Sequence, residues 1–192
     1  MNDHDLDAYG ELGAGISEIL FTAAEIGERV GALGAMISRD YAGLNPIAIG
    51  ALKGVLPFMA DLIRAVTIPI EVEFMSLASY SAESRDRGVV RLEKDVGLSI
   101  AGRHVLFVED VIDTGLTLNY LLRNLRAREP ASIEVCALFD RERRRLIDIP
   151  VKYKGFDLPD RFVVGYGLDF RERYRNLPFV GILKPDIFSP GS

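Results

Sequence analysis

The succession of apolar and polar segments predicts an α/β fold with a mostly parallel central sheet flanked by helices. Residues 105–108 are all apolar and residues 133–139 nearly so, which is typical of strands buried on both faces of a parallel sheet. A helix is predicted after the first of these strands, because its leucines recur at helical spacing: Leu118, Leu121, Leu122 and Leu125. Such a succession of strand, loop and helix places ligand-binding loops at the carboxyl ends of the strands.

Length and composition indicate a single globular domain covering residues 1–192. Of its residues 48% are apolar and 27% charged, and the net charge of -5 argues against a general nucleic-acid or membrane-surface partner. The single cysteine, Cys136, lies in an apolar run and is expected to be a buried thiol. The sequence shows neither a signal peptide nor an apolar run of about 18 residues, so we expect a cytoplasmic protein.

The first third of the chain predicts an N-terminal arm, a helical segment and a short strand. Residues 1–15 are polar and are expected to form a loose arm. Residues 16–38 predict one or two helices, interrupted near Gly31 and Gly34. Residues 47–50 then read as a short buried strand.

The loop after that strand contains Lys53 and Gly54, and a helix through Phe58 and Val66 follows. Residues 68–75 alternate apolar and charged side chains, as expected of a strand with one solvated face. Residues 78–88 lack apolar periodicity and predict a mobile loop, although a plain hairpin loop would have the same composition. Further strands are expected at residues 89–92 and 180–183.

The loop after residues 105–108 has the composition of an anion-binding site. Glu109, Asp110 and Asp113 precede Thr114-Gly115-Leu116-Thr117, where the predicted helix begins. Free amides at a helix N-terminus bind phosphates, and the threonine hydroxyls add donors. Carboxylates suit sugar hydroxyls or a hydrated Mg²⁺. The alternative for any one of these residues is a solvated acidic turn with an ordinary helix cap.

Taken together, residues 105–118 resemble the phosphoribosyl pyrophosphate (PRPP) signature of the type I phosphoribosyltransferases. The wording V-E-D-V-I-D-T-G-L-T at residues 108–117 most resembles the hypoxanthine-guanine branch, and residues 155–169 form a second match to it. The resemblance extends from about residue 37 to residue 183. It implies the type I fold with a small hood and a mobile lid. It also implies Mg²⁺-dependent purine salvage, in which PRPP and hypoxanthine or guanine give IMP or GMP and pyrophosphate, and assembly as a homodimer or homotetramer.

The resemblance also implies roles for the residues of the signature loop. Asp113 would be the catalytic residue and accept the proton from purine N7. Glu109 and Asp110 would hold the ribose hydroxyls, directly or through the metal. The 5′-phosphate would be cradled by four consecutive residues: Thr114, Gly115, Leu116 and Thr117.

Residues elsewhere would complete the site. Lys53, Gly54 and Arg175 would bind pyrophosphate. Asp169 would hold Mg²⁺ together with Glu109 and Asp110. The lid would be residues 78–88, with Ser79 and Tyr80 as the matching dipeptide.

The purine itself would be met by Arg141, Phe162 and Val163. Phe162 would stack on the base, and the backbone of Val163 would read its edge. Arg141 stands where members of the resembled family have a lysine that binds the exocyclic oxygen. Arginine can donate to an oxo group, but its planar fork is not equivalent to an ammonium. The preference among hypoxanthine, guanine and xanthine is therefore left open.

Three other functions compete with this one. Arg141 could make the enzyme prefer xanthine, or the fold could serve a regulator that senses PRPP or nucleotides without catalysis. An RNA-binding role could start from the arginines at positions 141 and 143–145, although a solvated charged face explains them as well. A generic nucleotide-binding domain lacks support, because neither the Rossmann nor the P-loop glycine motif is present.

Overall fold

The computed structural model describes residues 6–77 and 92–188. Its larger sheet has six strands in the order β4-β3-β2-β5-β6-β7, and all pairs are parallel except β3 with β4. These strands are β2 (Ile47–Leu52), β3 (Glu71–Leu77), β4 (Leu92–Lys94), β5 (His104–Ile112), β6 (Ser132–Asp140) and β7 (Tyr153–Asp157). The predicted α/β fold with a mostly parallel central sheet is confirmed.

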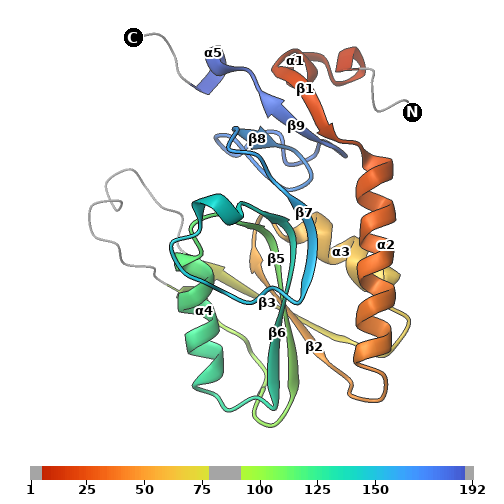
Figure 1. Ribbon diagram of the computed structural model, residues 1–192, viewed down its shortest axis with the longest axis vertical. Coiled ribbons are helices and arrows are strands. Elements are labelled where there is room, and N and C mark those ends of the chain that lie inside the picture. The colour runs from red at the N-terminus through yellow and green to blue at the C-terminus, as the bar shows by residue number, and fades with distance from the viewer. Residues whose placement is uncertain (1–5, 78–91, 189–192) are drawn as a thin grey trace.

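Helices cover both faces of this sheet (Figure 1). α2 (Ala23–Asp40) and α3 (Leu56–Ala65) lie on one face and α4 (Leu116–Arg126) on the other. Strand β5 shows why both faces are apolar: Leu106 and Val108 pack in the cluster with α2 and α3, while Val105 and Phe107 pack in the cluster with α4. Successive strand residues point to opposite faces, so an uninterrupted apolar run is what a doubly covered strand requires.

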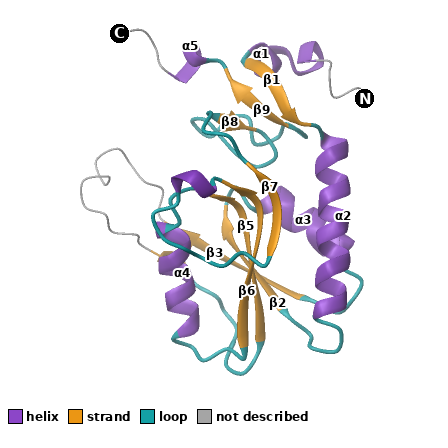
Figure 2. Ribbon diagram, viewed as in Figure 1, coloured by secondary structure: helices purple, strands orange, loops and turns teal. Residues whose placement is uncertain are grey.

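A second, smaller sheet lies beside the carboxyl ends of the central strands, near both ends of the chain (Figure 2). It is antiparallel, in the order β1-β9-β8. Its strands are β1 (Ile16–Phe21), β8 (Val163–Val164) and β9 (Val180–Leu183). A third apolar cluster lies here, around Phe179 and Val164. This sheet is the small hood that the family resemblance implied, and it brings the second sequence match to the central sheet.

The helical prediction for residues 16–38 is wrong in its first part. Residues 16–21 form strand β1, and α2 begins only after Thr22, whose hydroxyl accepts a hydrogen bond from the Glu25 amide while the Glu25 carboxylate accepts one from the Thr22 amide. This capping box is visible in the sequence as Thr-x-x-Glu. Gly31 and Gly34 do not interrupt the helix either, because Gly34 packs against Ala65 of α3.

The described part of the expected N-terminal arm is helical. Residues Leu6–Tyr9 form the 3-10 helix η1 and Gly10–Ala14 form α1. Leu6, Tyr9 and Leu12 pack against the apolar cluster of the hood, so these residues are anchored rather than loose. At the other end, α5 (Pro185–Phe188) follows β9.

Two more predictions from the sequence concern the lid and membrane-spanning helices. The predicted lid, residues 78–88 with Ser79 and Tyr80, falls outside the part of the chain that the structure describes. Among the described helices, none has the length and apolarity needed to cross a membrane.

Candidate active site

A cavity of about 380 Å³ lies at the carboxyl ends of β2 and β5, facing the hood. Parallel neighbouring strands end at the same edge, and this is where open α/β sheets bind ligands. Ten of the residues singled out in the sequence line it: Lys53, Gly54, Glu109, Asp110, Asp113, Thr117, Arg141, Val163, Asp169 and Arg175. Residues as far apart in the chain as Ala51 and Arg175 thus line the same cavity.

The signature loop forms a smaller hollow next to that cavity. Strand β5 ends at Ile112, and α4 begins at Leu116 after Gly115, which has φ +80°. Glycine adopts this left-handed conformation without strain, so it allows the chain to turn from strand to helix in three residues. The hollow, of about 220 Å³, is lined by Thr114, Gly115 and Thr117. The N-cap residue Gly115 has no side chain to cap α4, and the Leu116 amide makes only a long hydrogen bond of 3.5 Å to Thr114 Oγ1, so the first-turn amides remain suited to bind an anion. Leu116 is 52% exposed and its side chain has no hydrogen-bond donor, so only its backbone amide could bind an anion here.

Glu109 and Asp110 belong to strand β5 itself, because the strand continues beyond the apolar run. Burial, followed by the charge of Asp110, raises the pKa of Glu109 well above its ordinary value. Burial also raises the pKa of Asp110 to about 6. The Val111 amide donates to Asp110 Oδ1 at 2.8 Å, whereas the buried Oε2 of Glu109 has no hydrogen-bond partner among the described residues. Two crowded carboxylates with an unsatisfied oxygen suit a divalent cation.

The loop after β2 lies directly against this acidic pair. A Cβ on Gly54 would collide with the carboxylate of Asp110, so only glycine lets the backbone come this close. Lys53 reaches across the cavity to the hood, where its Nζ lies 3.1 Å from Glu172 Oε2. Arg175 lies on the same side and contacts Asp169 Oδ1 at 2.8 Å. Two cations and two carboxylates therefore face one another at the end of the cavity away from α4.

A third part of the site, next to Arg141, contains the residues predicted to meet a base. Arg141 Nη2 donates to the carbonyl of Arg161 at 2.9 Å, while its buried Nε has no hydrogen-bond partner among the described residues. Phe162 is 39% exposed as a residue, and its ring meets that of Phe170 edge to face, with centroids 5.7 Å apart. This exposure disfavours the alternative that Phe162 is a core residue. The ring lines a hollow of about 280 Å³ next to Arg141.

Comparisons with known proteins agree with this geometry. Residues 17–171 match the model of the phosphoribosyl transferase domain. The chain belongs to the phosphoribosyltransferase family.

Its relatives lie in one branch of that family. The hypoxanthine-guanine phosphoribosyltransferases of Streptococcus pneumoniae and Bacillus subtilis are each 46% identical, over 91% and 90% of this chain and 97% and 96% of their own. Among solved structures, the hypoxanthine phosphoribosyltransferase of Staphylococcus aureus superimposes with a TM-score of 0.87 at 41% identity, covering 92% of this chain and 96% of that one. The predicted membership of the hypoxanthine-guanine branch is confirmed.

Two residues of this phosphoribosyltransferase site were missed in the sequence. Arg144 Nε lies 3.2 Å from Asp113 Oδ1, in an ion pair without hydrogen-bond geometry. Glu172 contacts both Lys53 and Arg175. Arg144 was visible only as part of an arginine cluster, and Glu172 only as one of many acids in a charged loop. Neither contact could be foreseen, because each depends on how two distant loops meet.

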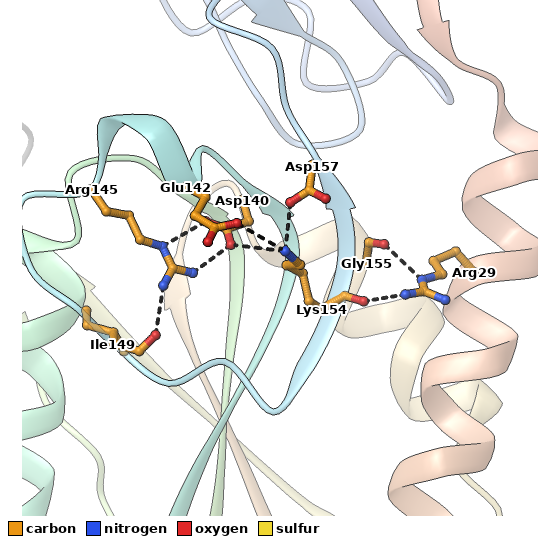
Figure 3. Close-up of polar contacts among 8 residues, drawn as sticks. All are labelled: Arg29, Asp140, Glu142, Arg145, Ile149, Lys154, Gly155 and Asp157. Carbon is orange, nitrogen blue, oxygen red and sulfur yellow. Dashed lines mark hydrogen bonds and ion pairs between the residues drawn. The ribbon is translucent and has the colours of Figure 1, made fainter.

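A second group of carboxylates lies close together elsewhere in the structure, but it is already neutralised by a lysine. Oxygens of Asp140, Glu142 and Asp157 all lie within 4.8 Å of one another. Figure 3 shows the ammonium of Lys154 among them, 2.8 Å from Asp157 Oδ1 and 3.6 Å from Glu142 Oε2. The Lys154 ammonium thus already provides the positive charge that these three carboxylates would otherwise offer to a metal ion. The predicted metal ligands, Glu109, Asp110 and Asp169, are not part of it.

The same region fixes the loop that carries Arg141 and Arg144. Arg145 donates two hydrogen bonds to the buried Asp140 carboxylate, from Nε at 2.9 Å and from Nη2 at 2.7 Å (Figure 3). Its Nη1 donates to the carbonyl of Ile149 at 2.8 Å. The loop then lies on the signature loop, where the Leu146 amide donates to the Thr114 carbonyl at 2.9 Å. The base end and the phosphate end of the cavity are thus joined by one ordered segment.

Proposed function

We propose that this protein transfers 5-phosphoribose from PRPP to hypoxanthine or guanine, giving IMP or GMP and pyrophosphate. The observation that carries the proposal is the arrangement of groups around one cavity and the two hollows beside it. An anion-binding helix N-terminus lies on one side and paired cations on the other, and Arg141 joins the cavity to the hollow lined by the exposed Phe162. PRPP has phosphates at both ends of a ribose, and its base acceptor attacks between them, so the groups of the site match those of the substrates.

The reaction breaks the bond from ribose C1′ to pyrophosphate and forms a bond from C1′ to a purine nitrogen. Positive charge grows on the ribose as the anionic leaving group departs, as in glycosyl transfer. Lys53 and Arg175 would bind that leaving group and stabilise its charge. The amides and hydroxyls of residues 114–117 would fix the 5′-phosphate, so that C1′ is held in place while the bond breaks.

Asp113 is the proposed general base. It lines both the 380 Å³ cavity and the phosphate hollow, and it pairs with Arg144, which lines the hollow at the base end. Its carboxylate would take the proton from N7 of the purine as the base attacks C1′. Phe162 would stack on the purine, the backbone of Val163 would read its edge, and Arg141 would donate to its exocyclic oxygen.

We propose Mg²⁺ as the cofactor, held by Glu109, Asp110 and Asp169. The unsatisfied Glu109 oxygen and the raised pKa of Asp110 support this set, since a cation would relieve both. When bound, Mg²⁺ neutralises phosphate charge and orients the ribose hydroxyls. It usually binds one or two carboxylates together with substrate oxygens and water, so a compact protein cage is not required.

A xanthine-preferring enzyme is the second candidate, and Arg141 favours it. Its Nη2 is held by the Arg161 carbonyl, and the planar guanidinium presents a second donor, Nε, from a fixed position. Xanthine has one more oxo group than hypoxanthine and could use an additional donor. A regulator that only senses PRPP is the third candidate, but it would have no need of the Asp113 carboxylate where the phosphate hollow meets the cavity.

The experiment is a steady-state assay with PRPP and Mg²⁺ that offers hypoxanthine, guanine, xanthine and adenine in parallel. We expect turnover of hypoxanthine and guanine, with adenine rejected. Preference for xanthine would select the second candidate. Binding of PRPP without turnover of any base would select the regulator.

We also propose that the protein assembles as a homodimer or homotetramer, as the family resemblance implied. The solved hypoxanthine phosphoribosyltransferase of Trypanosoma cruzi, 38% identical, is described in terms of the role of its C-terminal region in oligomeric state and activity. Light scattering of the purified protein, with and without PRPP, would test the assembly.

A further inference from the structure

The carboxylate of Glu172 bridges the two cations proposed to bind pyrophosphate. Its Oε2 accepts from Lys53 Nζ at 3.1 Å, and its Oε1 accepts from Arg175 Nη2 at 3.2 Å. Both cations line the 380 Å³ cavity, one from the loop after β2 and the other from the hood loop after β8. The carboxylate oxygens therefore occupy the donors that phosphate oxygens of the leaving group would need.

The hood loop is folded so that this carboxylate reaches the two cations that line the cavity. Arg171 and Glu172 have φ values of +54° and +63°, in the left-handed region that side chains other than glycine seldom adopt. The turn is closed by the Glu172 amide, which donates to Asp169 Oδ2 at 2.9 Å, and by backbone hydrogen bonds between Phe170 and Arg173. Two such residues in succession are costly, and strain of this kind concentrates at functional sites.

We propose that Glu172 is an internal counter-anion, which competes with pyrophosphate for Lys53 and Arg175 and thereby speeds its release. The inference rests on the proposed function and adds a residue to it. Before substrate binds, the carboxylate holds the two cations in place. When PRPP binds, its pyrophosphate must displace Glu172, and after transfer Glu172 reclaims the cations as pyrophosphate leaves.

The contacts are suited to such an exchange. The side chains of Lys53 and Glu172 are 65% and 59% exposed, and solvent-exposed ion pairs of this kind are weak and easily broken. Lys53, and after it Arg175, holds the pKa of the Glu172 carboxyl below its ordinary value. The carboxylate is thus charged at neutral pH, where it can compete with a phosphate for the two cations.

The alternative is that Glu172 only positions Arg175 for the ligand. The two roles predict opposite results for Glu172→Gln. Removing a competitor tightens pyrophosphate binding, by roughly three- to tenfold if the displaced contacts have the strength of exposed ion pairs. Removing a support weakens it.

The test is calorimetric titration of inorganic pyrophosphate, with and without Mg²⁺, into the wild type, Glu172→Gln and Glu11→Gln. Glu11 is the matched control, because its carboxylate binds Arg173 of the same loop at 2.7 Å and has no contact with Lys53 or Arg175 in the described structure. We expect the Kd of pyrophosphate to fall roughly three- to tenfold in Glu172→Gln and to stay unchanged in Glu11→Gln. Product inhibition by pyrophosphate should strengthen in parallel.

A second comparison separates competition for a specific donor from a diffuse charge effect. In a Lys53→Gln background, the gain from Glu172→Gln should shrink, since one of the contested donors is gone. An undiminished gain there, or an unchanged or weakened Kd in the single variant, would overturn the inference while leaving the proposed function intact. If the wild type binds neither pyrophosphate nor PRPP and turns over no base, the proposed function fails, and the inference fails with it.

Discussion

The ion pair between Asp140 and Arg145 is predicted to stabilise the fold and the base end of the cavity together. Their side chains are 2% and 12% exposed, and the guanidinium supplies all the hydrogen bonds that the two carboxylate oxygens receive in the described structure. Arg145→Met keeps the apolar stem but leaves the Asp140 charge buried without its partner. Breaking a buried pair in this way costs about 3–5 kcal/mol.

The structure places this variant at the lower end of that interval. Lys154 Nζ remains 3.9 Å from Asp140 Oδ2 and compensates part of the charge. We therefore expect the free energy of unfolding to fall by about 3 kcal/mol. For a domain of this size, about 2–4 °C in Tm accompanies each kcal/mol, so Tm should fall by about 6–12 °C.

The assay is thermal and urea unfolding followed by circular dichroism, with Arg143→Met as the matched control. Arg143 is an exposed arginine of η3 (Glu142–Arg144), and its substitution should change stability by less than about 0.5 kcal/mol. The double variant Asp140→Asn/Arg145→Met removes the stranded charge and should regain at least about 1 kcal/mol over Arg145→Met. Equal Tm values for Arg145→Met and Arg143→Met would refute the reasoning, as would a double variant no more stable than the single.

Three other predictions follow from the site. Phe162→Ala should raise the KM of the purine roughly five- to 100-fold, as expected for the loss of base stacking, and leave the Kd of PRPP within about twofold; equal loss of both in steady-state and binding assays would assign Phe162 to the core. Arg141→Lys should change the ratio of kcat/KM for xanthine over hypoxanthine, because an ammonium presents a different set of donors; an unchanged ratio would remove Arg141 from base selection. Burial raises the pKa of Asp110 from 3.8 to about 6, so the folded protein binds more protons than the unfolded chain between these values and loses stability as pH rises through them. Without Mg²⁺, Tm measured across that interval should fall less steeply in Asp110→Asn than in the wild type, and parallel profiles would contradict the assignment.

The central sheet and the signature loop could be predicted because local sequence determines them. The apolar run at residues 105–108 can only be buried on both faces, and Gly115 followed by leucines at helical spacing marks where strand becomes helix. The strands of the hood were harder to predict from the sequence. Ile16, Ile19 and Leu20 fit a helix as well as a strand, and only the capping box at Thr22 distinguishes them.

The contacts within the site were beyond the sequence for a different reason. Gly54 lies against Asp110 because two strands distant in the chain are neighbours in the sheet, and Glu172 reaches Lys53 because the hood closes over the sheet's edge. Residue types indicated the chemistry of each loop, and the family resemblance indicated which loops belong together. The partners of each charge depend on tertiary packing, so Arg144 and Glu172 entered the site only with the structure.

The most direct test of the account is Asp113→Asn, measured for both catalysis and PRPP binding. A neutral amide keeps the shape of the side chain but cannot accept the purine proton. We expect kcat with hypoxanthine to fall by about 10²–10⁴, while the Kd of PRPP from calorimetry stays within about threefold of the wild type. Turnover near that of the wild type would contradict the account, because the carboxylate at the centre of the cavity would then have no part in the transfer.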